Sequence, residues 1–416
     1  MQTPKGQQGL RFSKVAAALV VLVLALVLGA SGEDRAAGQE RSTAKQQAAG
    51  RSVPKPPTVE GQAWVLTDAD SGQYLAGDNP DEQLPPAATI QIMTALVALE
   101  EGADLDEEVT VPEEAEAYVG STYSNVGLIA GERLTVRDLL TAALDPSGID
   151  AIYTLANHLG DGSVDKFAQK MNAEASTMGL QNTHFDDPTG LDTPGNYSSA
   201  RDLATMARAA LGYSTFAEIV RTKDATLNTQ NRKIEVSNTN QILTTYPKAT
   251  GVKTGFSPEA GANIVASAED GDESYIAVIL GADDPDRRFR DAEALLEYAF
   301  TYYERRPLVV KDEVYGEVAP PYRPGESVEL AAVEDVTGSV NAGSDVEREV
   351  TTEEELPPSA SAGQELGEVE VLVDGQSVGR SPLVAQEGYE EASLWDKAWY
   401  YAVEWVGGSI WRLIRG

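Results

Sequence analysis

The sequence contains no cysteine among its 416 residues and only two histidines, His158 and His184. Without cysteine the chain has neither disulfides nor thiolate metal sites, and two histidines far apart in sequence do not favour a zinc site. His158 falls in a helical pattern and His184 in a loop, and we interpret both as structural. We therefore predict no metal and no other cofactor.

Basic residues are also scarce. The chain has 32 lysines and arginines but 66 aspartates and glutamates, which gives a net charge of −34. Nucleic-acid binding requires a basic surface that neutralises phosphates, so this balance excludes it as a function. The same balance disfavours simple electrostatic adhesion to anionic lipid. The length is nevertheless enough for two or three domains, and 42% of the residues are apolar, which allows a sizeable core.

The N-terminus has the order of a secretory signal. Lys5, Arg11 and Lys14 precede fourteen apolar residues, 15–28, and small residues follow up to Gly32. Fourteen residues are short for a spanning helix, so we predict a signal peptide over 1–32, with an uncleaved N-terminal anchor as the alternative. Either interpretation predicts an exported, extracytoplasmic protein. Residues 33–58 are polar and end in prolines, which indicates a flexible linker.

Two regions with different patterns follow the linker. In 59–306, short strands lie at both ends of a block of helical patterns, which predicts an α+β domain; residues 92–99 read as a buried helix. In 307–388, short β-like runs predict a small all-β domain. The acidic stretch 347–364, EREVTTEEELPPSASAGQ, interrupts these runs, and we expect it to be a solvated loop.

The last segment, 391–416, holds four of the five tryptophans. Its apolar residues recur at steps of three and four, which predicts an amphipathic helix on a membrane surface. The alternative is a helix that packs on the protein itself. The residues of this apolar stripe are Trp395, Trp399, Ala402, Val403, Val406, Ile410 and Leu413.

Several stretches of 59–306 match one known family in order and spacing. They include QIMTALVALE, LTVRDLLTAAL, FAQKMNAEA, TGLDTPGNYSSARDLATMARAAL and GVKTGFSPEAGANIVA. In these the sequence resembles the serine-type D-Ala-D-Ala carboxypeptidases, the low-molecular-mass penicillin-binding proteins. The resemblance implies an antiparallel sheet with a helical cluster, as in β-lactamases and transpeptidases, then a small β domain and an amphipathic C-terminal helix. It also implies peptidoglycan stem peptides ending in D-Ala-D-Ala as the ligand.

The family's catalytic motifs are Ser-x-x-Lys, Ser-x-Asn and Lys-Thr-Gly, and only the third is complete here. The nucleophile's position is occupied by Ala88 and the base's by Gln91, whose side chains can neither be acylated nor accept a proton near neutral pH. The second motif begins with Ser147 but has Ile149 where the family has asparagine.

The third motif is Lys253, Thr254 and Gly255. In the family its lysine and threonine recognise the terminal carboxylate of the substrate, and its glycine allows the peptide backbone to approach. We predict that these three residues, with Ser147, bind substrate. The alternative is that the motif persists only because its strand packs well.

The sequence leaves three possible functions for the protein. We favour a catalytically inactive, membrane-associated pseudoenzyme that holds D-Ala-ended stem peptides or acts as a scaffold for other cell-wall enzymes. The second is an active D,D-carboxypeptidase with a non-standard nucleophile such as Ser147, with Lys253 as its base. The third is a purely structural envelope protein whose cleft binds nothing.

Overall fold

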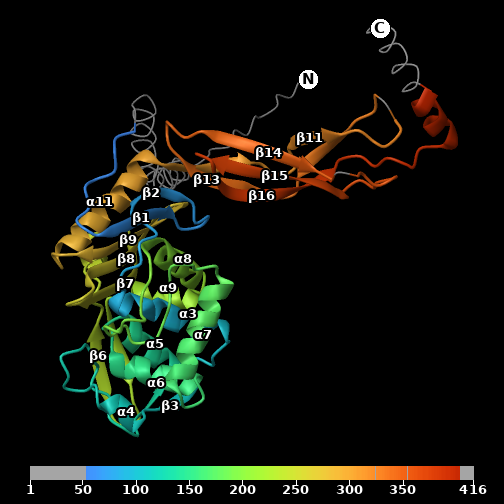
Figure 1. The fold of residues 1–416 in the computed structure, drawn as a ribbon. Helices are drawn as coiled ribbons and strands as arrows, with labels where there is room; N and C mark the ends of the chain where they lie inside the picture. Colours follow the sequence, from blue (N-terminus) through green and yellow to red (C-terminus); the bar gives the residue numbers. More distant parts are fainter. Residues whose placement is uncertain (1–52, 324, 354, 403–416) are drawn as a thin grey trace, which may run out of the picture. The chain divides into compact units, whose positions relative to one another are not determined.

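The computed structural model describes residues 53–323, 325–353 and 355–402. Its central element is a five-stranded antiparallel sheet with the strand order β2-β1-β9-β8-β7. Helix α11 covers one face of this sheet, and a cluster of helices that includes α8 and α9 covers the other (Figure 1). The strands are β1 (Ala63–Asp68), β2 (Tyr74–Asp78), β7 (Ala249–Ser257), β8 (Gly261–Asp270) and β9 (Glu273–Ala282).

The helical cluster forms between the second and third strands of this sheet in chain order. Side chains of Thr135, Ser163 and Ser199 accept hydrogen bonds from the first turns of α5, α7 and α8, which fixes where these helices begin. The helices between these strands are η1 (Ala87–Ile90), α3 (Gln91–Glu100), α4 (Glu113–Glu116), α5 (Val136–Leu144), α6 (Ile149–Leu159), α7 (Val164–Thr177), α8 (Ala200–Leu211), α9 (Ser214–Arg221) and α10 (Ile242–Thr245), while α11 (Arg287–Tyr302) follows β9. Two small two-stranded sheets accompany them: β3 (Glu108–Thr110) pairs with β4 (Arg133–Thr135), and β5 (Asp224–Asn228) pairs with β6 (Lys233–Ser237).

Helix α3 runs through the middle of this cluster, as the sequence predicted. Its residues from Gln91 to Ala98 are all buried, and it contacts α5, α6, α7 and α8. A helix that contacts neighbours on every side needs apolar residues all round, which explains why the segment shows no amphipathic pattern.

A buried carboxylate holds the long loop 117–132 in place beside α6. Asp150 is fully buried, and it accepts backbone N–H bonds from Val126 at 3.1 Å, Leu128 at 2.9 Å and Ala151 at 3.0 Å. Charge-assisted bonds of this kind are stronger than neutral ones and fix a loop that has no strand or helix of its own. The same loop carries Tyr123 and Ser124 to the cleft described below.

The C-terminal region forms a separate all-β core. One sheet has the order β11-β12-β16-β15-β14, and a second pairs β10 with β13. The expectation that 347–364 is a solvated loop is wrong for its first part, because residues 347–352 belong to β14, which pairs along its whole length with β15. The strands are β10 (Glu304–Val309), β11 (Val314–Val318), β12 (Val328–Ala332), β13 (Val336–Val340), β14 (Val346–Thr352), β15 (Glu365–Val373) and β16 (Gln376–Ala385).

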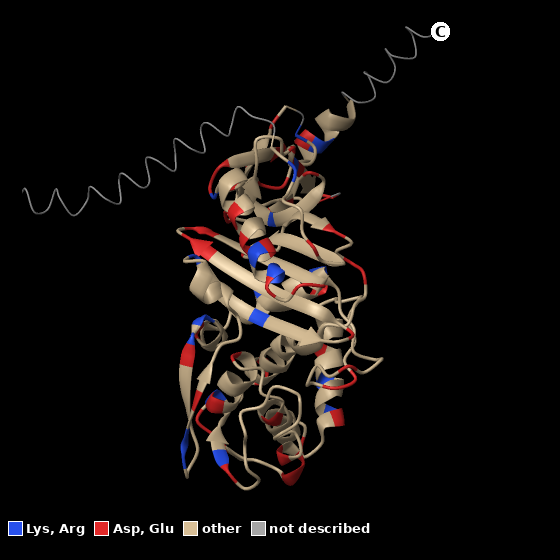
Figure 2. Cartoon of the chain, turned by 90° about the vertical axis from the view of Figure 1, so that its left-hand side faces the viewer, with Lys and Arg blue, Asp and Glu red and all other residues tan. Residues whose placement is uncertain are grey.

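Acidic side chains are spread over helices, strands and loops rather than gathered in one patch (Figure 2). At the C-terminal end of the described residues, 394–402 are helical, and Leu394, Trp395 and Trp399 expose 84%, 85% and 67% of their surface. No helix among the described residues is long and apolar enough to cross a membrane. The predicted signal peptide 1–32, most of the linker and residues 403–416 lie outside the described residues.

We expect Asp150→Asn to destabilise the domain by about 2 kcal/mol, because the neutral amide replaces a charged acceptor and cannot accept every N–H bond that the carboxylate accepts. Urea unfolding measures this difference. Asp165→Asn, at an exposed position in the first turn of α7, is the matched control and should change the unfolding free energy by no more than about 0.5 kcal/mol. Equal effects of the two variants would contradict the proposed anchor.

Candidate functional site

A cleft of about 570 Å³ lies between the edge strand β7 and the helical cluster. It brings together residues from all three motif regions, although they lie far apart in the sequence. Its lining consists of Ala88, Thr122, Tyr123, Ser124, Pro146, Ser147, Ile149, Thr189, Gly190, Leu191, Asp192, Thr239, Thr254, Gly255, Phe256, Ser257, Pro258 and Arg288.

The backbone around Ala88 is held by close contacts with two glycines. A Cβ atom at Gly255 would lie 2.9 Å from the carbonyl oxygen of Pro86 and 3.0 Å from the backbone nitrogen of Ala88. One at Gly190 would lie 2.4 Å from the carbonyl oxygen of Ala87, at a φ of +82° that also favours glycine. The backbone of residues 86–88 therefore packs closely against Gly190 and Gly255 in the cleft wall.

Gln91 lies one turn after Ala88 and is fully buried. Its Nε2 donates to the carbonyl oxygen of Thr189 at 3.0 Å, and its Oε1 has no hydrogen-bond partner among the described residues. The amide thus ties α3 to the Thr189 loop, but it supplies no group that could take a proton near neutral pH.

Lys253 and Ser147 are in direct contact. The lysine is 1% exposed, and its Nζ donates to Ser147 Oγ and to the carbonyl oxygen of Thr254. Ser147 has a φ of +61°, in the left-handed region that few residues other than glycine adopt. Such conformations are found at functional sites, where the surrounding structure enforces them.

Burial shifts the pKa values of Lys253 and of Asp145, whose charges influence each other. Removal from water lowers the pKa of Lys253 to about 7, and the nearby charge of Arg288 acts in the same direction while Asp145 opposes it. Burial likewise raises the pKa of Asp145 to about 8, against the effect of Lys253. Asp145 Oδ1 accepts a bond from Asn238 Nδ2 at 2.9 Å, which assigns this asparagine a structural role.

The end of the cleft beside Thr254 is rich in hydrogen-bond donors. Thr254 Oγ1 shares a hydrogen bond with Thr239 Oγ1 at 2.8 Å. Arg288 donates through Nη1 to the carbonyl oxygens of Gly255 and Asn263, while its buried Nε has no partner among the described residues. Burial lowers the pKa of Arg288 to about 10, so it remains a cation at neutral pH.

The sequence patterns did not indicate that Arg288 and Thr239 line the cleft, or that the buried Asp145 influences Lys253. A signal existed for Arg288, because it stands four residues before Ala292 on the inward stripe of α11, where a charged residue is unexpected. Of the motif residues, Ala88, Ser147, Ile149, Thr254 and Gly255 line the cleft, whereas Gln91 and Lys253 are buried and do not. Neither histidine lines it; His158 lies 3.3 Å from Glu107, and His184 binds the carbonyl oxygen of Gly195.

The comparison with known proteins decides the family. The sequence profile of the D-alanyl-D-alanine carboxypeptidases matches residues 50–284, and that of the C-terminal domain of penicillin-binding protein 5 matches residues 303–391. The chain belongs to the D-alanyl-D-alanine carboxypeptidase family. The fold resembles that of penicillin-binding protein 5 from Haemophilus influenzae, with a TM-score of 0.70 and 30% identity over 81% of this chain and all of that one.

Other members of the family are similar over most of their length. D-alanyl-D-alanine carboxypeptidase DacF of Bacillus subtilis is 33% identical, with 80% of this chain and 87% of that protein aligned. DacC of Escherichia coli is also 33% identical, with 84% and 90% aligned. The Streptomyces K15 DD-transpeptidase matches the first domain alone, with a TM-score of 0.57 and 35% identity over 59% of this chain and 98% of that one.

Proposed function

We propose that this chain is a family member that no longer acylates and that holds stem peptides ending in D-Ala by their terminal carboxylate. The observation that carries the proposal is the cleft itself, which presents the methyl group of Ala88 where a nucleophile would stand but keeps its donor-rich end. Such a protein would act outside the cytoplasm, where peptidoglycan is found. The exposed tryptophans of 394–402 favour contact with a membrane surface, because tryptophan prefers the headgroup level.

The chain lacks three separate catalytic groups of the family: the nucleophile, the base and the amide that holds the substrate. Ala88 has no oxygen to form an ester, Gln91 cannot act as base, and Ile149 cannot hold a substrate amide. Removing one member of a catalytic unit costs several orders of magnitude in rate, and the members are not additive. We therefore assign no turnover through the family's route to this protein.

Carboxylate binding is supported by two groups that line one end of the cleft, Thr254 and Arg288, and by Lys253, which is buried and reaches the cleft wall through its contact with Ser147. Thr254 supplies a hydroxyl, Arg288 a fixed cation, and Lys253 a cation below its pKa of about 7. Strand β7 lies at the edge of the sheet, so an extended peptide can approach it beside these groups. Tyr123 and Phe256, which are 50% and 60% exposed, offer apolar surface beside it.

The contact between Lys253 and Ser147 favours a second candidate, in which Ser147 is a nucleophile and Lys253 its base. A lysine with a pKa near 7 is neutral in a large fraction of molecules at physiological pH and could accept the serine proton. In that case the chain would be a slow carboxypeptidase, and the experiments below distinguish the two functions.

The purified protein should not form a covalent, denaturation-resistant adduct with a fluorescent penicillin, because the serine position is alanine. The triple variant Ala88→Ser, Gln91→Lys and Ile149→Asn should form one, since the backbone at residue 88 is positioned by Gly190 and Gly255 rather than by its side chain. Gel fluorescence measures the adduct. The double variant Gln91→Lys and Ile149→Asn is the control, and labelling of the unchanged protein that Ser147→Ala abolishes would establish the second candidate instead.

An acetylated tripeptide ending in D-Ala-D-Ala should bind in a calorimetric titration, and Lys253→Ala or Thr254→Val should weaken it by about tenfold, the value of one charge-assisted hydrogen bond. Thr254→Val keeps the shape of the side chain, so it remains informative if Lys253→Ala fails to fold. Lys233→Ala, at an exposed position on β6, is the control. Absence of heat at millimolar peptide would leave only a structural role for the cleft.

Affinity for this peptide should fall as the pH rises from about 6 to about 9. Through this range Lys253 loses its positive charge near pH 7 and Asp145 gains a negative one near pH 8, and both changes disfavour a carboxylate ligand. The same peptide with a C-terminal amide should show little dependence on pH. Peptide hydrolysis that increases through pH 7 would have the opposite sign and would support Ser147 as nucleophile.

A further inference from the structure

Strands β5 and β6 form a hairpin whose turn, residues 229–232, contacts the loop 117–132 beside the cleft. Arg232 in this turn donates through Nε to Glu132 Oε1 at 2.8 Å and through Nη2 to Glu132 Oε2 at 3.0 Å, which makes a bidentate ion pair. The same Nη2 donates to the backbone carbonyl oxygen of Gly127. No residue of the hairpin lines the cleft, so any influence of the hairpin on the cleft passes through this loop.

The carboxylate of Glu132 is buried, which makes its pairing with Arg232 important. The residue is only 4% exposed, and its Oε2 also accepts a hydrogen bond from the backbone nitrogen of Ile129 at 3.1 Å. The hydrogen bonds from Arg232 lower the pKa of Glu132, so the carboxylate is ionised at neutral pH. Loss of the arginine would leave a buried charge without its counter-charge, which distinguishes this pair from an exposed one.

Gln230 connects the same hairpin turn to the end of the loop. Its Nε2 donates to the backbone carbonyl oxygen of Gly131 at 3.1 Å, and its Oε1 accepts a hydrogen bond from the backbone nitrogen of Arg133. The amide therefore satisfies one acceptor and one donor of the same backbone segment. Together with the Arg232 pair, this contact attaches the hairpin turn to the loop at several consecutive points.

Two charged side chains of opposite sign hold the stretch 126–128 of the loop. Asp150 in α6 accepts hydrogen bonds from the backbone nitrogens of Val126 and Leu128. Arg232 in the hairpin donates to the carbonyl oxygen of Gly127, which lies between them. The stretch has no helix or strand of its own, so its position depends on these side-chain contacts.

The stretch that the hairpin holds leads directly into the cleft lining. Ser124 lines the cleft, and its carbonyl oxygen accepts a hydrogen bond from the backbone nitrogen of Ile149 at 3.0 Å. Its Oγ donates to the carbonyl oxygen of Pro146. Pro146 and Ile149 lie on either side of Ser147, so hydrogen bonds connect the loop to the turn that carries this serine.

We propose that Arg232 is a positioning residue for the cleft, which acts by holding the wall formed by residues 122–124 in place. A wall that is in place in only a fraction of the molecules reduces the apparent affinity for a ligand by that fraction. The effect of Arg232 on affinity rests on the proposed peptide binding in the cleft. Its effect on the loop does not depend on any ligand, so the two can be measured separately.

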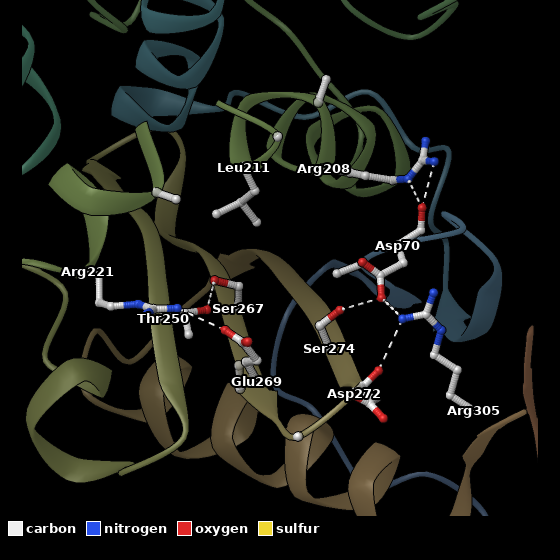
Figure 3. A pocket seen from close by; sticks show the side chains of 16 residues that line it. Asp70, Arg208, Leu211, Arg221, Thr250, Ser267, Glu269, Asp272, Ser274 and Arg305 are labelled. Carbon is white, nitrogen blue, oxygen red and sulfur yellow. Dashed lines mark hydrogen bonds and ion pairs between the residues drawn. The ribbon is translucent and has the colours of Figure 1, made fainter. Parts of the chain in front are cut away.

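The experiment compares Arg232→Ala with Arg208→Ala in the full chain. Arg208 is the matched control because its Nε and Nη2 both donate to the backbone carbonyl oxygen of Asp70, at 2.9 and 2.7 Å, beside a cavity that shares no lining residue with the cleft (Figure 3). We expect Arg232→Ala to weaken binding of the acetylated D-Ala-D-Ala tripeptide about tenfold and Arg208→Ala to leave it unchanged. Arg232→Lys keeps the charge without the fork, and its affinity should lie between the two.

A measurement of the loop itself uses the absence of native cysteine. Tyr123→Cys introduces the only thiol of the chain, and a nitroxide attached to it reports the mobility of the cleft wall by electron paramagnetic resonance. Mobility should increase when Arg232→Ala is added and stay unchanged when Arg208→Ala is added. Because Arg232→Ala leaves Glu132 buried and unpaired, the double variant Arg232→Met and Glu132→Gln removes the ion pair without leaving a buried charge, and it should show the same increase.

Unchanged label mobility in both Arg232 variants would overturn the proposal. Unchanged peptide affinity in these variants would also overturn it, while leaving the proposed function of the cleft intact. Equal losses of affinity in Arg232→Ala and Arg208→Ala would indicate a general loss of stability and would contradict a positioning role. If the unchanged protein binds no peptide, the proposed function fails, and the label mobility alone decides whether Arg232 holds the wall.

Discussion

The side chain of Lys253 is the constraint on which the cleft depends. An amine removed from water needs hydrogen-bond partners, and it finds them in Ser147 Oγ and the carbonyl oxygen of Thr254. The first of these bonds joins the edge strand β7 to the turn before α6, where Ser147 has a left-handed backbone conformation. The same turn leads into Ile149, so the position of this part of the cleft wall follows from how one buried lysine is accommodated.

That arrangement is difficult to explain by stability alone. Burying an ionised group costs several kcal/mol, and a pair such as Lys253 with Asp145 recovers this cost only with good geometry, while Asp145 Oδ2 has no partner among the described residues. At the neighbouring position 91 the chain has an uncharged amide, bonded to the Thr189 carbonyl. A lysine at this buried position agrees with the proposed binding of a carboxylate, which would supply the negative charge that the interior lacks.

Sequence patterns predicted most elements of the first domain, because its helices and strands bury residues at regular spacing. Helix α3 and the β8–β9 hairpin are examples. The sequence did not reveal Arg288 and Thr239, which reach the cleft from separate parts of the chain, or Asp145, which acts on Lys253 from the interior, because no local pattern shows such convergence. Strand β14 was taken for a loop because its side chains from Glu347 to Thr352 are exposed on both sides, which removes the alternation that reveals a strand.

The site shows how reactive atoms can be absent while the shape around them is kept. At residue 88 the close contacts are between backbone atoms and two glycines, so an alanine in place of a serine removes an oxygen without disturbing what positions it. At residue 91 the amide takes up a hydrogen bond of its own, so the helix keeps its attachment to the Thr189 loop. Catalysis requires particular atoms, whereas the cleft requires only backbone packing and the Lys253 network. Ligand binding, which uses the second set of features, can therefore persist where the chemistry, which uses the first, does not.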